Sequence, residues 1–131
     1  MPFNSNIIVT EGFEKSLKKL SIQEEDLHKP INNFVETEER CKFGITTDSF
    51  CIITRQDGFM LWKIRLPNKH AKSGKRCGFR LLLVYVDSDK TWRLHNIFEK
   101  SEKIEKEIQK RIRELISHYQ KIPHLDNKNL F

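Results

Sequence analysis

The sequence has little of what marks a metal-binding, disulfide-bonded or membrane-spanning protein. Its 131 residues include only three cysteines, and no two of them have the Cys-x-x-Cys spacing of a zinc or redox motif. The five histidines lack metal-ligand spacings such as His-Glu-x-x-His. The longest apolar run is the six residues from Leu81 to Val86, whereas a membrane-spanning helix needs roughly 20. We therefore expect reduced thiols, no bound metal and no cofactor.

A secretory signal is also missing from the N-terminus, which has no basic region followed by the usual ~7 to 15 apolar residues. We therefore expect a cytoplasmic protein. The chain length of 131 residues falls in the range of about 100 to 200 residues that is typical of one domain. The predicted domain covers residues 1–122, and a polar C-terminal tail covers residues 123–131.

The N-terminal part of the chain predicts a short strand followed by a helical hairpin. The β-branched run at residues 7–9 is typical of a strand, and Thr10 can cap a helix that follows it. Ser21 and Glu24 have the spacing of a capping box, which predicts that a second helix begins at Ser21. The charged run at residues 36–40 is predicted to be a solvated helix end.

The rest of the chain predicts an antiparallel sheet and a last helix. Strands are expected at residues 50–54, 59–66, 79–86 and 91–98, with the third buried on both faces. Apolar residues then recur at helical spacing from Ile104 to Tyr119, and Pro123 is expected to end that helix. The predicted fold class is α+β: a curved, mainly antiparallel sheet of four to five strands, packed by the N-terminal hairpin and the C-terminal helix.

One segment carries the whole positive excess of the chain. The protein has 24 Lys plus Arg against 18 Asp plus Glu, and seven of the cations lie between Lys63 and Arg80. Without those seven the balance is 17 against 18. Such a concentration of charge indicates a polyanionic partner.

Strand alternation suggests a site within this segment. Lys63 and Arg65 should share one face of a strand, opposite Trp62, Ile64 and Leu66, and Arg80 should join them from the neighbouring strand. A phosphodiester would fit between these cations. RNA is the better substrate for a catalytic site, because its 2′-hydroxyl already lies beside the scissile phosphate. Lys63 is then the candidate base, and Arg65 and Arg80 would hold phosphate oxygens. An exposed basic face without catalytic activity is the alternative.

Further cations and one histidine complete the candidate set. His95 and Lys100 are candidates for the general acid, since they lie on or just after the last strand. Alternation would place His95 on one face with Arg93 and Ile97, with Asn96 and Phe98 on the other. The candidate RNA- or ribosome-binding cations are Lys69, Lys72, Lys75, Arg76 and Arg93.

The segments WKIRLP, KSGKRCGFRLLLVYVD and WRLHNIFEKSEK resemble the RelE/HigB-like toxins of bacterial type II toxin-antitoxin systems. The resemblance covers roughly residues 59–119. It implies a small RelE-like fold, ribosome-dependent cleavage of mRNA and a cognate antitoxin. By position, Lys63, Arg65 and Arg80 correspond to the family's basic catalytic residues, and Lys100 falls at the end of the last strand. The chain departs from the family at Phe98, where many members have tyrosine.

A second interpretation belongs to a different functional class. The chain could be a non-catalytic binding protein of the RelE/ParE fold, either a gyrase-directed toxin or a regulator that binds an antitoxin or nucleic acid. The basic trio favours the nuclease, because ParE-like chains usually lack it. In either case an antitoxin is expected to bind over the basic face, and such a complex should weaken as salt rises.

Overall fold

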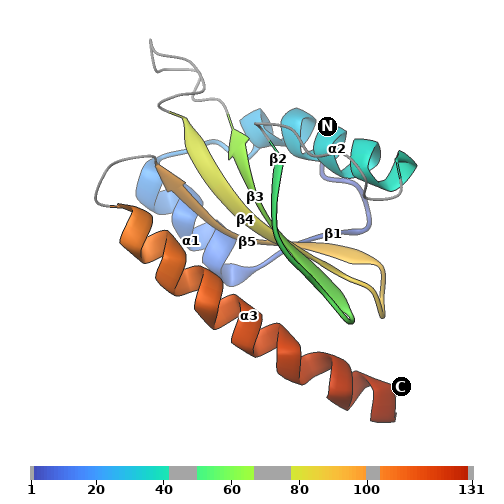
Figure 1. Ribbon diagram of the computed structural model, residues 1–131. Coiled ribbons are helices and arrows are strands. Elements are labelled where there is room, and N and C mark those ends of the chain that lie inside the picture. Colours follow the sequence, from blue (N-terminus) through green and yellow to red (C-terminus); the bar gives the residue numbers. More distant parts are fainter. Residues whose placement is uncertain (1, 42–49, 67–77, 100–103, 130–131) are drawn as a thin grey trace.

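One five-stranded sheet forms the centre of the computed structural model, which describes residues 2–41, 50–66, 78–99 and 104–129 (Figure 1). Three helices pack on the sheet, so the predicted α+β class is confirmed. This architecture is compatible with the small RelE-like fold that the resemblance implied. The elements in chain order are β1 (Ile7–Val9), α1 (Glu11–Leu20), α2 (Glu25–Arg40), β2 (Phe50–Gln56), β3 (Phe59–Leu66), β4 (Phe79–Val86), β5 (Thr91–Glu99) and α3 (Ile104–Asn129).

The sheet is a meander with one parallel strand added at its edge. Its order is β1-β5-β4-β3-β2, and neighbours from β2 to β5 are antiparallel, as predicted. β1 pairs in parallel with β5 through Ile7–Val9. Asp57 and Gly58 form the turn between β2 and β3, and Gly58 has φ 96°, a conformation that favours glycine. β4 is the central strand and is buried at all eight positions, as its apolar sequence predicted.

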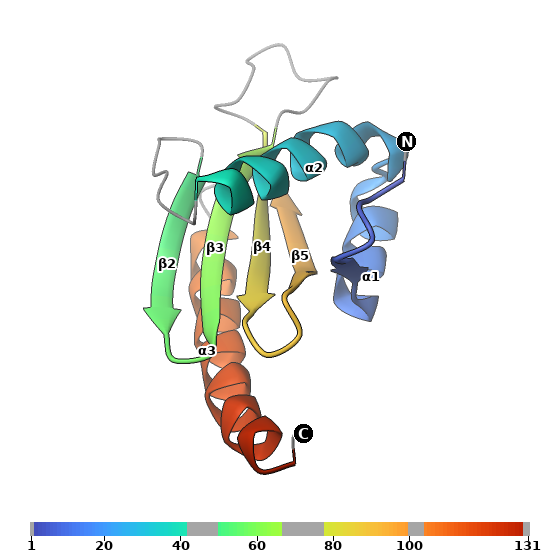
Figure 2. The ribbon, with the colours of Figure 1, turned by 90° about the vertical axis from the view of Figure 1, so that its right-hand side faces the viewer.

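Helices cover both faces of the sheet. Figure 2 shows α1 and α2 on one face and α3 on the other. Trp62 and Ile64 of β3 pack with α1 and α2, whereas Leu61 packs with Ile108 and the rest of the α3 stripe. The predicted alternation along β3 is therefore confirmed. Of the described residues, no helix combines the length and the apolar sequence needed to cross a membrane.

Thr10 links the end of β1 to the start of α1. Its Oγ1 accepts a hydrogen bond from the Phe13 backbone N–H at 3.3 Å, which is the predicted N-cap. The same hydroxyl donates to the carbonyl of Leu94 at 2.7 Å. One side chain thus starts the helix and also fixes it to β5.

Ser21 ends α1, so the predicted start of the second helix at this residue is wrong. Ser21 has left-handed backbone dihedrals, with φ 56° and ψ 41°. Its N–H donates to the Lys18 carbonyl at 3.3 Å, and the Ile22 N–H donates to the Leu17 carbonyl at 2.9 Å. This is the hydrogen-bond pattern of a helix C-terminus, and it leaves α2 to begin at Glu25.

The charged run at residues 36–40 is only partly solvated, which corrects a second expectation. Glu38 is 0% exposed, because it follows Phe34 by four residues and Val35 by three and so lies on the same buried face of α2. Glu39 is exposed but accepts hydrogen bonds from Asn6 Nδ2 at 2.8 Å and Trp92 Nε1 at 3.2 Å. The run therefore helps to fix α2 onto β5 and onto the residue that precedes β1.

The last helix does not stop at Pro123, contrary to the prediction. α3 continues to Asn129, so residues 124–129 of the predicted tail are helical. A proline inside a helix removes one backbone hydrogen bond at a cost of about 3 kcal/mol, but it does not forbid continuation. The buried side chains of Ile108, Ile112, Leu115 and Tyr119 fix the preceding turns of α3 on the sheet.

Candidate functional site

Two arginines face each other near the end of β3 and the start of β4. In the β3–β4 register, Arg65 is the direct partner of Arg80, and Lys63 is the partner of Leu82. Direct cross-strand partners point to the same face of a sheet, and Leu82 belongs to the core beneath α3. Lys63, Arg65 and Arg80, here called the basic trio, therefore lie together on the α3 side, as alternation predicted.

The three members of the basic trio differ in their access to solvent. Arg65 is exposed and Lys63 is half-buried. Arg80 is only 5% exposed, and its Nη1 donates to the carbonyl of Phe79 at 3.3 Å. A ligand would therefore meet Arg65 first, with Arg80 as a buried charge beneath it.

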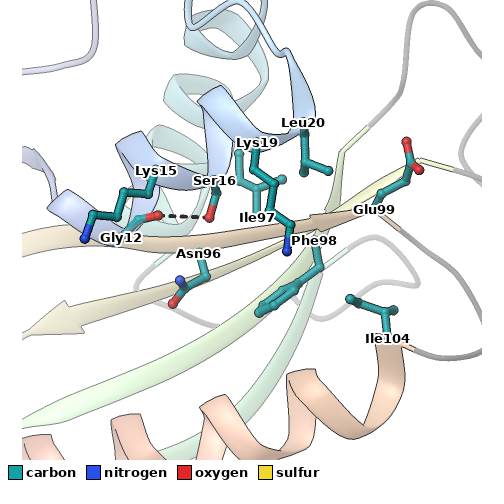
Figure 3. A pocket seen from close by; sticks show the side chains of 10 residues that line it. All are labelled: Gly12, Lys15, Ser16, Lys19, Leu20, Asn96, Ile97, Phe98, Glu99 and Ile104. Carbon is teal, nitrogen blue, oxygen red and sulfur yellow. Dashed lines mark hydrogen bonds between the residues drawn. The ribbon is translucent and has the colours of Figure 1, made fainter.

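On the other side of β4, residues of β5 pair with Arg80 and with Leu82. Arg80 is opposite Phe98, and Leu82 is opposite Asn96. Asn96 and Phe98 also line a pocket of about 410 Å³ between α1, β5 and the start of α3 (Figure 3). The basic trio is thus bordered by β5 residues that also line a pocket.

Asn96 brings a cation of α3 to the sheet. Its Oδ1 accepts a hydrogen bond from Arg111 Nε at 2.7 Å, and Arg111 Nη1 lies 3.4 Å from Glu114 Oε1. The sequence pattern alone gives Arg111 no role at the sheet. The overlooked signal is position, because Arg111 directly precedes Ile112 of the buried stripe and so lies at its border.

A bulge at His95 changes the faces of the residues that follow it. The register shifts between Leu82, which is opposite Asn96, and Leu83, which is opposite Leu94. His95 is the extra residue, and one extra residue inverts the alternation beyond it. His95 and Arg93 share the α3 side as expected. Asn96 and Phe98 join them there, while Ile97 lies with the opposite core, so that part of the prediction is wrong.

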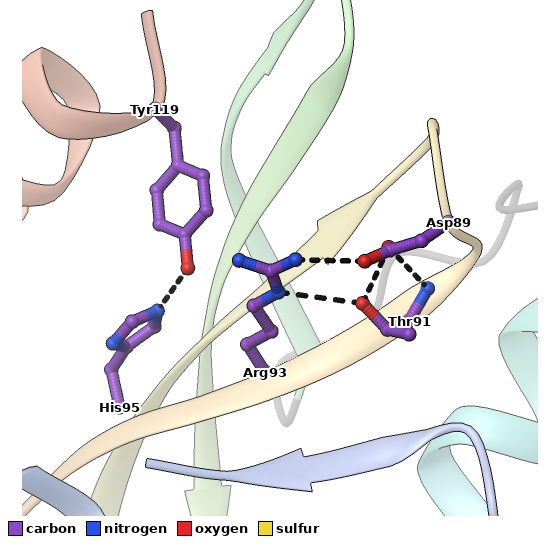
Figure 4. A network of polar contacts seen from close by, with 5 residues as sticks. All are labelled: Asp89, Thr91, Arg93, His95 and Tyr119. Carbon is purple, nitrogen blue, oxygen red and sulfur yellow. Dashed lines mark hydrogen bonds and ion pairs between the residues drawn. The ribbon is translucent and has the colours of Figure 1, made fainter. Parts of the chain in front are cut away.

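His95 lies in the contact between β5 and α3 (Figure 4). Its side chain is buried, and its Nε2 is 2.5 Å from the hydroxyl oxygen of Tyr119. Burial lowers the pKa of His95 to about 4, and the charges of Arg111, His118 and Arg93 add to this effect. His95 is therefore neutral at pH 7. The sequence pattern places Tyr119 only in an apolar stripe, although a buried tyrosine hydroxyl usually requires a polar partner.

Arg93 already has an anionic partner within the protein. Its Nη2 lies 2.8 Å from Asp89 Oδ2, and Thr91 donates to Asp89 Oδ1 through its hydroxyl at 2.6 Å and its N–H at 3.2 Å (Figure 4). Burial raises the pKa of the Asp89 carboxyl, but hydrogen bonds from Thr91 and Arg93 outweigh it and leave the pKa lowered. The network holds the turn between β4 and β5, so an RNA phosphate would compete with Asp89 for Arg93.

Several predicted site residues lie outside the described residues: Lys69, Lys72, Lys75, Arg76 and Lys100. Within the described part of the chain, no group of three or more His, Cys, Asp or Glu residues could hold a metal ion.

Comparison with known proteins does not identify the chain. No protein-family model matches it, and a search of curated proteins finds no match.

Proposed function

We propose that the protein is a ribosome-dependent mRNA endonuclease toxin, acting in the cytoplasm and neutralised by a cognate antitoxin. The observation that carries the proposal is the direct pairing of Arg65 with Arg80, with Lys63 on the same face. Like charges directly opposite each other destabilise a sheet. A bound phosphate would relieve this repulsion, and its oxygens would match the planar guanidinium groups.

The proposed reaction uses the ribose of the substrate as nucleophile. Lys63 accepts the proton of the 2′-hydroxyl, and the oxygen attacks the adjacent phosphorus. Arg65 and Arg80 stabilise the negative charge that accumulates on the phosphate oxygens. The bond to the 5′-oxygen breaks, and Lys100 protonates that leaving oxygen. No metal ion enters this scheme.

His95 is less suited than Lys100 to the role of general acid. With a pKa of about 4, its imidazole ring is neutral at neutral pH and is a poor proton donor. In the proposed mechanism His95 therefore acts as a positioning residue, which holds the bulge of β5 against α3 through Tyr119. The other predicted cations, from Lys69 to Arg76, would attract ribosomal RNA and mRNA electrostatically.

A second candidate function is a binding protein of the same fold without nuclease activity. The observation that favours it is the burial of Arg80, at 5% exposure, because a phosphate would have to displace covering groups to reach this guanidinium. Gyrase-directed toxins and antitoxin-binding regulators belong to this class of function.

Expression in bacterial cells distinguishes the two candidates. The nuclease proposal expects growth arrest by the wild type together with transcript cleavage at ribosome-occupied codons. A Lys63→Gln, Arg65→Ala variant should abolish both effects, because both residues belong to the basic trio. Arrest without any cleavage would reject the nuclease and support the second candidate.

A matched control removes an exposed cation from elsewhere. Arg113 is exposed on α3, so Arg113→Ala should retain the arrest and the cleavage. Circular dichroism of all three proteins would establish that they are folded. Equal loss of cleavage in the Arg113→Ala variant would mean that general positive charge, and not the basic trio, is responsible.

A further inference from the structure

The pocket shown in Figure 3 is a groove along the outer side of β5. It has a volume of about 410 Å³, and we call it the β5 groove. Residues 96–99 of β5 border it, together with α1 and Ile104 at the start of α3. No member of the basic trio lines it, so it is separate from the proposed nuclease site.

Along this groove the outer side of β5 has no strand partner in the part of the chain that the structure describes. β1 pairs with β5 only from Trp92 to Leu94, and the chain then turns into α1 at Thr10. Among the described residues, no strand pairs with the outer side of β5 from Asn96 to Glu99. An unpaired strand edge is a template for another extended chain, because alternate N–H and C=O groups point outward.

The side chains of the β5 groove combine an apolar floor with a basic wall. Phe98 and Ile104 are partly buried, and both pack against the core beneath α3. Lys15 and Lys19 are exposed on successive turns of α1 and line the same groove. Figure 3 shows both lysine side chains extending from the helix toward β5.

The lysines of this wall are available to a partner. Lys15 Nζ lies 3.1 Å from Glu11 Oε1, with side-chain exposures of 75% and 81%. Ion pairs this exposed contribute little stability, so a partner carboxylate can replace Glu11 at small cost. The groove therefore offers an acidic ligand two positive charges on α1, against one negative charge from Glu99, which is exposed and also lines it.

We infer that the β5 groove binds an extended acidic segment of a partner protein. The segment would pair with the open edge of β5, place an apolar side chain on Phe98 and Ile104, and direct carboxylates to Lys15 and Lys19. The open edge selects an extended peptide, and the lysines select its charge. The inference does not depend on the RNA chemistry proposed above.

Two synthetic peptides test the binding. One alternates glutamate and leucine over six residues, and the other alternates lysine and leucine. Nuclear magnetic resonance titration of the full-length protein should show binding of the acidic peptide alone, with shifts at residues 96–99 and 104. Hydrogen exchange of the outward-facing amides of β5 should slow in the complex. No binding at millimolar peptide, or shifts centred on the basic trio, would overturn the inference.

Two variants examine the contribution of charge. The double variant Lys15→Glu, Lys19→Glu should lower the affinity for the acidic peptide by about tenfold, which is the effect expected for two reversed surface charges. Lys18→Glu is the matched control, since Lys18 is exposed on the same helix but does not line the groove, and it should change affinity less than about twofold.

Ser16→Phe should block the β5 groove with its ring while the lysine charges remain. Ser16 lines the groove and is half-buried. Unchanged affinity in this variant would show that the peptide is attracted only by charge and would overturn the inference. Glutamate and leucine as free amino acids, titrated separately, should not reproduce the shifts. Shifts of equal size would indicate a small-molecule site in place of a peptide site.

Discussion

His95 and Tyr119 form a hydrogen bond between the bulge of β5 and the face of α3, with 2.5 Å between His95 Nε2 and the tyrosine hydroxyl. Their rings meet edge to face, with centroids 5.5 Å apart and an interplanar angle of 77°. A second hydrogen bond joins the same two elements, from Arg111 Nε of α3 to Asn96 Oδ1 of β5 at 2.7 Å. Because burial favours the neutral imidazole, the contact between His95 and Tyr119 should depend on pH.

The first prediction is a loss of stability in weak acid. The pKa of His95 is lowered from 6.5 to about 4 in the folded protein, so the unfolded chain takes up the proton first as pH falls. The contribution of His95 is complete above pH 6.5 and is lost as pH falls toward 4, by at most about 3 kcal/mol in the free energy of unfolding. Urea unfolding between pH 4 and 7.5 measures this change.

His95→Gln is the control for this effect. Glutamine can still hydrogen-bond to Tyr119, but it does not titrate. The stability of this variant should fall less than that of the wild type over the same range, because only the titratable groups that the two proteins share still contribute. Parallel pH profiles for the two proteins would contradict the prediction.

The second prediction concerns the other partner of the bond. Tyr119→Phe keeps the ring in the core but leaves His95 Nε2 without its partner. An unsatisfied buried polar atom costs about 1–3 kcal/mol, so the free energy of unfolding should decrease by that amount at pH 7. Thermal or urea unfolding would measure it. Combining Tyr119→Phe with His95→Leu should cost less than the sum of the two single changes, and strict additivity would show that the two side chains are not coupled.

Near His95, the sequence no longer predicts correctly which face of the strand each side chain occupies. Alternation placed Lys63 and Arg65 correctly, because β3 pairs with β4 without a register shift. It failed from Asn96 onward because of the bulge at His95. A bulge depends on how two strands pair and on what packs against them, and the sequence of one strand contains no unambiguous sign of it.

The third prediction tests the close approach of α1 to this bulge. A Cβ added at Gly12 would lie 2.9 Å from the carbonyl oxygen of His95 and 3.3 Å from Asn96 Nδ2. Alanine normally favours a helix over glycine by about 1 kcal/mol. Here Gly12→Ala should instead lower the free energy of unfolding by about 1–3 kcal/mol, because α1 or β5 must move.

A second substitution in α1 provides the comparison. Glu14 is exposed in the same helix, so Glu14→Ala should change stability by no more than about 0.5 kcal/mol. A Gly12→Ala variant that is as stable as Glu14→Ala would mean that the contact with His95 relaxes without cost. Chemical unfolding of both variants under identical conditions would decide.

The fourth prediction is a gain in stability at the end of α1. Ser21 has φ 56°, a left-handed conformation that glycine adopts more readily than serine. Ser21→Gly should raise the free energy of unfolding by about 0.5–1 kcal/mol. Lys90, with φ 57° in the turn after β4, is a second position at which glycine should act in the same direction. A decrease in both variants would show that the lost side chains matter more than the backbone.

Ser21 also illustrates a limit of local sequence patterns. Its spacing to Glu24 predicted the start of a helix, yet the residue ends the preceding one. A serine can make the hydrogen bonds needed at either the start or the end of a helix. Whether Ser21 starts or ends one depends on where the apolar stripe of α1 leaves the core. Phe13 and Leu17 are the buried residues of α1, and Ile22, just beyond the helix end, also packs against the same core. The element types were predictable from periodicity, whereas this boundary depended on tertiary packing.

The last prediction returns to the basic trio. Arg65 and Arg80 are direct cross-strand partners, and like charges in this arrangement cost roughly 0.2–1 kcal/mol. Arg65→Ala should therefore leave the protein equally stable or slightly more stable at low salt without phosphate. Addition of inorganic phosphate at constant ionic strength should stabilise the wild type, because the anion binds only the folded site. The variant should gain much less, whereas Arg113→Ala should gain as much as the wild type. Melting temperatures of the three proteins across a phosphate titration measure this difference, and equal gains in all three would mean that the anion does not bind between Arg65 and Arg80.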